Sequence, residues 1–214
     1  MNLVEWWVSN GGVVFEAIGI LAYALSGLVG AARKKLDIVG MAMVAAFAAF
    51  GGGTLRDILL DIRPFYWVKN LGWIYAIIVL CVVALLFVRS KHIEFTERAV
   101  LWPDAIGLGI FGASGTQIAL EHGMPAIVAV VMGAITAVFG GVLRDIALNE
   151  IPAAFSDHQP NAIVVLLGSW FVVIFNALGL SSFWSVLCTA LLIIAFRLAA
   201  IVMNWRLPEW KVNG

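Results

Sequence analysis

Phe50-Gly51-Gly52-Gly53-Thr54-Leu55-Arg56-Asp57 is the stretch that decides how this chain is interpreted. It lies inside a long apolar segment that otherwise has the composition of a membrane-spanning helix. Three successive glycines lower the helix propensity there, by about 1 kcal/mol each relative to alanine. An arginine and an aspartate follow within one turn, and such residues enter hydrocarbon only where they face water or a partner. The stretch therefore predicts a helix that is interrupted at membrane depth.

The same pattern returns as Phe139-Gly140-Gly141-Val142-Leu143-Arg144-Asp145. Aligning the two arginines shifts the chain by 88 residues (144 − 56), and 16 positions between 17 and 64 are then identical to their counterparts. The Ser-Gly pairs that begin at Ser26 and Ser114 belong to this alignment. Self-similarity over such a distance indicates an internal repeat.

The composition is that of a polytopic membrane protein. Of the 214 residues, 63% are hydrophobic and 12% are charged, which is about half the charge of a soluble domain. The mean hydropathy is +1.01. The net charge is zero, so nothing indicates nucleic-acid binding. Both cysteines lie in apolar runs, and we expect no disulfide, no metal site and no cofactor.

Hydropathy predicts an all-α protein with seven transmembrane helices, because about 20 apolar residues are needed to cross a bilayer. The second and fifth spans contain the glycine motifs, and we expect both helices to be broken there. Residues 1–214 then form a single transmembrane domain. The expected spans are 13–32, 38–62, 71–89, 100–120, 125–148, 160–178 and 182–203.

The repeat and the number of spans together predict an inverted three-plus-three architecture. Repeat 1 covers about 13–89, repeat 2 covers about 100–178, and 182–203 is an additional helix. Three spans per repeat force the second copy to enter the membrane from the opposite side. The copies are then related by a pseudo-two-fold axis in the membrane plane.

Basic residues predict the orientation, because they concentrate in cytoplasmic loops. This places the N-terminus outside and the C-terminus in the cytoplasm of a protein of the inner (plasma) membrane. The loop that contains Glu150 and Asp157 falls on the cytoplasmic side although it has no basic residue. The basic groups that we assign to the cytoplasm are Arg33, Lys34 and Lys35, then Arg89, Lys91 and Arg98, then Arg206 and Lys211.

The paired charges have two interpretations. Neighbouring residues on a helix point about 100° apart, so we expect Arg56 not to face Asp57, and Arg144 not to face Asp145. One member of each pair would line a solute pathway, and symmetry would bring each arginine toward the aspartate of the other repeat. The alternative is that the arginines snorkel to the interface and anchor helix ends. Because the charges of each pair cancel, they do not indicate cation selectivity.

Four other polar residues occupy equivalent positions in the two repeats. Glu16 and Asp104 begin their spans, which fits either a stabilising acid at a helix N-terminus or an acidic pore mouth. Ser26 and Ser114 fit either close helix packing or hydroxyls that line a pore. A catalytic serine needs a histidine base within reach, and the chain offers neither serine one, so we do not expect an enzyme.

The doubled motif, at Gly51–Asp57 and Gly140–Asp145, together with the two Ser-Gly pairs, resembles the trimeric intracellular cation channel (TRIC) family in its prokaryotic branch. The resemblance covers nearly the whole chain. It implies a homotrimer among membrane lipids, with one pore through each protomer for potassium or other monovalent cations. It also implies that Gly51, Gly52 and Gly53 form one pore hinge and Gly140 and Gly141 the other. Val142 stands where a third glycine is expected.

The same bacterial family is also described as glycine transporters, so two function hypotheses remain. A passive cation channel and a small-solute carrier both use a site at the midplane between inverted repeats. A carrier differs in that its access must alternate between the two sides. The residues alone do not separate the two, and the resemblance favours a potassium-permeable channel.

Overall fold

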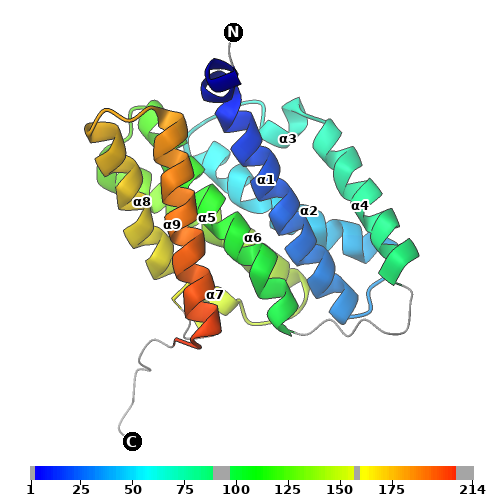
Figure 1. The fold of residues 1–214 in the computed structure, drawn as a ribbon. Coiled ribbons are helices and arrows are strands. Elements are labelled where there is room, and N and C mark those ends of the chain that lie inside the picture. The colour runs from blue at the N-terminus through cyan, green and yellow to red at the C-terminus, as the bar shows by residue number, and fades with distance from the viewer. Residues whose placement is uncertain (1–2, 89–96, 157–159, 206–214) are drawn as a thin grey trace, which may run out of the picture.

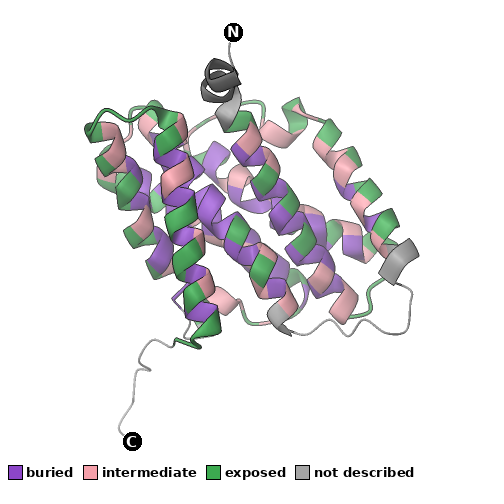
Figure 2. Cartoon of the chain, viewed as in Figure 1, coloured by how far each residue is buried: buried purple, intermediate pink, exposed green. Residues whose placement is uncertain are grey.

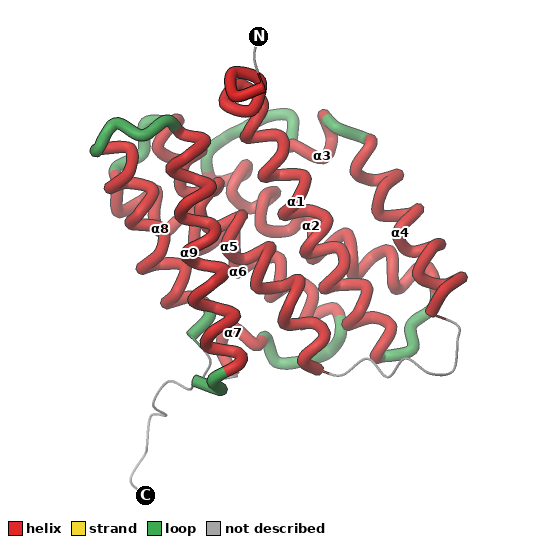
Figure 3. Tube along the Cα trace, viewed as in Figure 1, coloured by secondary structure: helices red, strands yellow, loops and turns green. Residues whose placement is uncertain are grey.

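The computed structural model describes residues 3–88, 97–156 and 160–205, and describes side chains at 12–84, 99–155 and 160–205. Within these residues the chain is a bundle of helices without a strand (Figure 1 and Figure 3). The all-α prediction is confirmed. The helices are α1 (Leu3–Arg33), α2 (Ile38–Leu59), α3 (Tyr66–Lys69), α4 (Gly72–Val88), α5 (Glu97–Glu121), α6 (Ala126–Ala147), α7 (Ala153–Ser156), α8 (Ala162–Ala177) and α9 (Ser182–Val202).

The longer helices coincide with the expected spans. Among the described residues, α2, α6, α9 and the Gly12–Arg33 part of α1 are long and apolar enough to cross a membrane. The apolar parts described in α4 and α8 are shorter, Gly72–Ala84 and Ala162–Ala177. Helix α5 is long but less apolar, and it packs against α1, α6, α8 and α9. A helix surrounded by other helices presents little surface to lipid, which explains why α5 tolerates more polar residues.

Both glycine motifs lie inside continuous helices. Helix α2 runs through Gly51–Gly53, and α6 runs through Gly140 and Gly141. The expectation that these two helices are broken at the motifs is therefore wrong. Tertiary packing overrides the low helix propensity of glycine here.

The glycines instead allow α2 and α6 to cross closely. A Cβ atom built on Gly52 would overlap the carbonyl oxygen of Thr136, and one built on Gly140 would overlap the carbonyl oxygen of Ala48. Thr136 lies 88 residues after Ala48, so the two contacts are reciprocal between the repeats. Small residues at such a crossing are the usual means of close helix contact in membranes.

Helices α1 and α5 meet through a second reciprocal contact. A Cβ atom on Gly19 would lie 2.9 Å from the Phe111 ring, and one on Gly107 would lie 2.7 Å from the Tyr23 ring. The Tyr23 and Phe111 rings stack on each other with 5.5 Å between their centroids. The residue numbers rise along α1 as they fall along α5, so the two helices are antiparallel.

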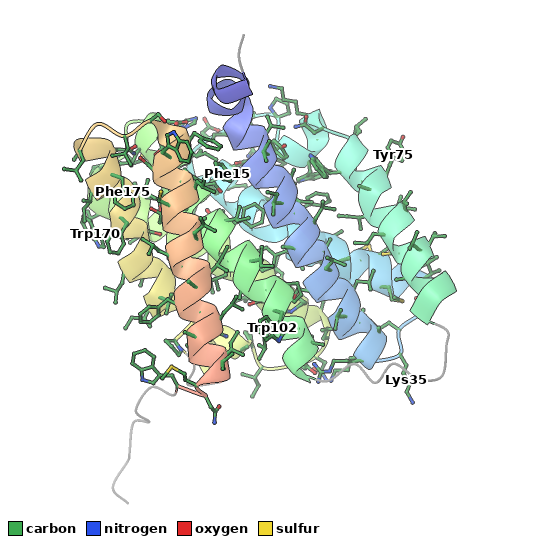
Figure 4. All side chains as sticks on the ribbon, in the orientation of Figure 1. Phe15, Lys35, Tyr75, Trp102, Trp170 and Phe175 are labelled. Carbon is green, nitrogen blue, oxygen red and sulfur yellow. The ribbon has the colours of Figure 1, made fainter. Side chains whose placement is uncertain are left out.

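Buried residues follow the inner faces of the helices, and exposed residues follow the outer faces (Figure 2). Many exposed residues are large and apolar. Tyr75 of α4 and Trp170 of α8, for example, lie at opposite edges of the bundle (Figure 4). An apolar exterior around an interior with buried charges suits a protein whose solvent is a lipid bilayer.

The loop after α1 and the loop after α6 lie at the same end of the bundle. Lys34 Nζ lies 2.8 Å from Glu150 Oε1, and Arg33 Nη2 lies 4.0 Å from the same oxygen. The loop without a basic residue of its own is therefore paired with the basic loop that precedes α2. Other side chains used for the predicted orientation lie outside the described residues: Arg89, Lys91, Arg98, Asp157, Arg206 and Lys211.

Candidate functional site

Arg56, near the C-terminal end of α2, binds two carboxylates inside the bundle. Its Nη1 donates to Glu16 Oε1 of α1 at 2.6 Å, and its Nε and Nη2 donate to Asp57 Oδ1 at 2.9 and 2.7 Å. The other oxygen of Asp57 accepts from the Tyr66 backbone N–H at 3.2 Å, which ties α3 to the same group. We call Glu16, Arg56 and Asp57 the Arg56 cluster; each is at most 6% exposed.

Arg144, at the equivalent position of α6, repeats this arrangement and adds a hydroxyl. Its Nε donates to Asp145 Oδ1 at 2.8 Å, and its Nη1 donates to Asp104 Oδ1 of α5 and to Ser26 Oγ of α1. Asp145 Oδ2 accepts from the Ala153 backbone N–H at 2.9 Å, at the start of α7. Asp104, Arg144, Asp145 and Ser26 are buried, and we call them the Arg144 cluster.

Several expectations about these charges are wrong. Each arginine does bind the aspartate that follows it, because its long side chain folds back beside its own helix end. Neither arginine has its carboxylate partners in the other repeat: Arg56 binds Glu16 and Arg144 binds Asp104. Burial also rules out that the arginines snorkel to an interface.

Glu16 and Asp104 are not simple helix-start residues. Helix α1 begins at Leu3, so Glu16 lies well inside it, and both acids serve as buried partners of an arginine. Each cluster therefore contains one guanidinium and two carboxyl groups. When both carboxyl groups are ionised, the formal charge of each cluster is −1, so the charges do not cancel.

The two serines have different surroundings. Ser26 Oγ accepts from Arg144 and lies 3.3 Å from the Val100 carbonyl oxygen, to which it donates. Ser114 Oγ is buried and has no hydrogen-bond partner among the described residues. In the antiparallel contact between α1 and α5, Ser26 lies level with Asp104, and Ser114 lies level with Glu16. The two repeats therefore place their serines at equivalent backbone positions, but only Ser26 binds a cluster arginine.

The five glycines divide into two groups. Gly51, Gly52 and Gly140 contact the facing helix, where a Cβ atom would meet Leu143, Thr136 or Ala48. Gly53 and Gly141 lie beside the clusters instead. A Cβ on Gly53 would lie 3.8 Å from Arg56 Nη2, and one on Gly141 would lie 3.4 Å from Asp104 Oδ1.

An apolar layer separates the clusters. Glu16 and Ser26, which mark the two levels on α1, are ten residues apart and therefore about 15 Å apart along the helix at 1.5 Å per residue. The stacked rings of Tyr23 and Phe111 lie on the α1–α5 contact between those levels. The Tyr23 hydroxyl donates to the Ala137 carbonyl oxygen of α6. The interior thus alternates from charged to aromatic to charged.

Among the buried polar residues that the prediction from the sequence missed are Asn161 and Arg197. Asn161 precedes α8 and lines a small cavity beside the Arg144 cluster. Arg197 of α9 is fully buried. A charged residue in the expected span 182–203 was the available signal, since an ionisable residue at membrane depth is a functional candidate by default. The shared spacing of 40 residues, from Glu16 to Arg56 and from Asp104 to Arg144, was the available signal for the arginine partners.

Comparison with known proteins places this fold. A family model described as a glycine transporter matches residues 13–91 and 101–177, two ranges that begin 88 residues apart. A UPF0126 membrane protein of Vibrio cholerae is 32% identical over 204 residues, which cover 94% of this chain and 83% of that protein. The UPF0126 inner membrane protein YadS of Escherichia coli is 27% identical over 199 residues, which cover 92% and 95%.

Solved structures agree with this assignment. The TRIC trimeric intracellular cation channel orthologue from Rhodobacter sphaeroides superposes with a TM-score of 0.84 at 28% identity, over 92% of this chain and 100% of that one. A second structure, described in terms of conductance through TRIC cation channels, gives a TM-score of 0.80 at 31% identity, over 94% and 98%. The chain therefore belongs to the family of the TRIC channels, whose matching family model carries the description glycine transporter.

Proposed function

We propose that this protein is a monovalent cation channel of the inner membrane, permeable to potassium, with one conduction pathway in each protomer of a homotrimer. The observation that carries the proposal is the pair of buried clusters, each with one arginine against two carboxyl groups. A net negative charge inside an apolar bundle attracts cations and repels anions. The solved relatives named as trimeric cation channels support the same function and assembly.

The pathway that we propose runs between inverted repeats. Repeat 1 covers about 13–89, repeat 2 covers about 100–178, and α9 is the additional helix of a single transmembrane domain with seven spans. The reciprocal contacts, Gly52 with Thr136 and Gly140 with Ala48, support a two-fold relation, because such an axis makes each contact occur twice. The doubled match of one family model supports it independently.

The orientation that we propose puts the N-terminus outside and the C-terminus in the cytoplasm. Helix α1 begins at one end of the bundle and α9 ends at the other (Figure 1). The ion pair of Lys34 with Glu150 supports this orientation. It joins the basic loop after α1, which is predicted to be cytoplasmic, to the loop after α6, which has no basic residue of its own to indicate its side. Lysine and arginine near helix ends are the main determinant of topology.

The glycines, in this proposal, form the crossing about which α2 and α6 move relative to each other. Each of these helices carries one cluster arginine close to its end. A small rotation about the crossing would displace both clusters against α1 and α5. Ser26, on α1, would then lose its bond from Arg144, and Ser114, on α5 at the level of Glu16, would come within reach of Arg56. The glycine crossing would thereby shape or gate the pathway.

Recording from the purified full-length protein in planar bilayers, under a potassium chloride gradient, tests the function. We expect discrete openings that reverse near the potassium equilibrium potential. The same preparation is then placed in liposomes and tested for uptake of labelled glycine. Silent bilayers together with saturable glycine uptake would contradict the channel and identify a carrier. Protein-free bilayers and liposomes are the blank control.

A further inference from the structure

A small cavity lies beside the Arg144 cluster. Its volume is about 20 Å³, and Asp104, Arg144, Asp145 and Asn161 contribute its polar lining. A cavity of this volume holds about one water molecule or one ion of similar radius. A dehydrated potassium ion is close to that radius, so the size alone admits either occupant.

Asn161 lines this cavity, and its side-chain oxygen is unsatisfied. The residue is only 5% exposed, and its Oδ1 has no hydrogen-bond partner among the residues that the structure describes. Leaving a buried acceptor unpaired is unfavourable, so an atom in this position calls for a partner. The adjacent carboxylates cannot supply one, because they are acceptors themselves. The donors of the lining, Arg144 and Tyr23, make their hydrogen bonds to other groups, and neither is bonded to this oxygen.

The helix that follows Asn161 does not bind this oxygen either. Asn161 is the N-cap residue of α8, but its backbone is helical, with φ −83° and ψ −75°, and its side chain makes no capping bond. A side-chain cap requires extended backbone at that position, so the oxygen has no partner in the first turn of α8.

The charges of the lining suit one positive charge. Arg144 Nε and Nη1 already donate to Asp145, Asp104 and Ser26. The two carboxylates outnumber the guanidinium by one, and a carboxylate oxygen can accept more than one contact. Within the described residues, no group of three or more acidic, histidine or cysteine side chains is arranged to hold a metal ion. A single monovalent cation would complete the charge balance, and a divalent ion would exceed it.

The first repeat lacks the equivalent oxygen. Helix α4 of repeat 1 begins at Gly72 as α8 begins at Ala162, and residues 71–74, which span the positions equivalent to Asn161, carry no side-chain oxygen. The two clusters are therefore chemically different on one side, although their arginine–carboxylate contacts agree.

We propose that the cavity binds one dehydrated monovalent cation, coordinated by Asn161 Oδ1 and by oxygens of Asp104 and Asp145. The proposal rests on the proposed function only in identifying this ion with the conducted one. It makes the pathway asymmetric, with a single binding step in the half that belongs to repeat 2. Asn161 is then a specificity-determining residue, because an amide oxygen and carboxylates together replace part of the hydration shell of the ion.

Anomalous scattering from thallium, a potassium substitute, tests this site directly. Crystals of the full-length protein are grown in thallium nitrate, and we expect an anomalous peak in contact with Asn161 Oδ1. Asn161→Leu removes the oxygen at similar volume and should abolish the peak, whereas Asn161→Asp should retain it. Asn176→Leu is the matched control on α8, because Asn176 bonds Gln117 and lies outside the cavity; it should retain the peak.

A titration in solution supplies a second measurement. Potassium chloride replaces N-methyl-D-glucamine chloride at constant ionic strength, and the thermal unfolding temperature of the detergent-solubilised protein is followed. We expect stabilisation by potassium, with at least a tenfold higher half-maximal concentration in Asn161→Leu than in Asn176→Leu.

Each outcome decides the proposal. A wild-type crystal without a peak at saturating thallium would overturn it in favour of a bound water only. A peak that survives Asn161→Leu would remove Asn161 from the site. Potassium currents without a peak would leave the channel and overturn the cation site, whereas a peak without currents would leave the cation site and overturn the channel.

Discussion

The Arg56 cluster and the Arg144 cluster occupy equivalent places in the two halves of the chain, and they differ at the edges rather than in the middle. In both, an arginine at the end of a helix binds the next residue and an acid 40 residues earlier. The Arg144 cluster also binds Ser26 of α1, whereas Ser114, at the level of the Arg56 cluster, has no hydrogen-bond partner among the described residues. A cavity lined by Asn161 lies beside the Arg144 cluster. The comparison teaches that the repeat preserves a charge-balancing core, while the unequal edges distinguish the two ends of the pathway.

The largest expected effect comes from removing an arginine. Arg144→Met leaves two buried carboxylates without their partner, and breaking a buried ion pair in this way costs about 3–5 kcal/mol. Arg56→Met should cost somewhat less, because Arg56 has no serine partner to lose. Thermal unfolding and the yield of folded oligomer measure both. Lys34→Met is the control, because its exposed pair with Glu150 is worth at most about 1 kcal/mol. Equal shifts for Arg144→Met and Lys34→Met would contradict the structural role of the clusters.

The glycines should separate into contact positions and open positions. Gly52→Ala and Gly140→Ala force α2 and α6 apart and should destabilise the protein by about 1–3 kcal/mol, as overpacking does. Gly53→Ala has room for its methyl group and should be neutral, or stabilising by up to about 1 kcal/mol through helix propensity. Unfolding temperatures of the three variants provide the measurement. If Gly53→Ala were as damaging as Gly52→Ala, flexibility rather than close contact would explain the motif.

The two serines should differ in their effect on stability, and Ser114→Ala should have the smallest effect of all. Ser26→Ala removes an acceptor from Arg144 and should cost about 1.5–3 kcal/mol, the range for hydrogen bonds to charged groups. Ser114→Ala removes an unpaired hydroxyl and should leave the unfolding temperature nearly unchanged. Thermal unfolding under identical detergent conditions tests the pair. A larger loss for Ser114→Ala would show that the halves are more alike than their contacts suggest.

Much of the fold followed from the sequence because membrane helices must satisfy their own backbone hydrogen bonds. The expected positions of α2 and α6 agree closely with the helices. The sequence predicts broken helices at the glycines because the helix propensity of glycine is low. The facing helix decides otherwise, since Gly52 of α2 lies against Thr136 of α6. The pairing of Arg56 with Asp57 was excluded on Cβ directions alone, although an arginine near a helix end is long enough to fold back.

The acids and the asparagine show two further limits. Glu16 and Asp104 were recognised as equivalents, yet their partners depend on how α1 packs against α2 and α5 against α6, which the sequence does not reveal. Asn161 was missed because a search for repeated residues passes over a position that has no polar equivalent at the start of α4, where residues 71–74 are Leu, Gly, Trp and Ile. A repeat therefore points to what the halves share and conceals what distinguishes them.

The central claim is that the second acid of each cluster, Glu16 or Asp104, gives the cluster a net negative charge and makes the pathway selective for cations. The most direct test is the reversal potential of a Glu16→Gln and Asp104→Asn double variant in a potassium chloride gradient. Both amides can still accept from the arginines, so the contacts survive while each cluster becomes neutral. We predict a reversal potential shifted from the potassium toward the chloride equilibrium value, with Glu150→Gln as the unshifted control. A double variant that conducts with the reversal potential of the wild-type protein would contradict the account.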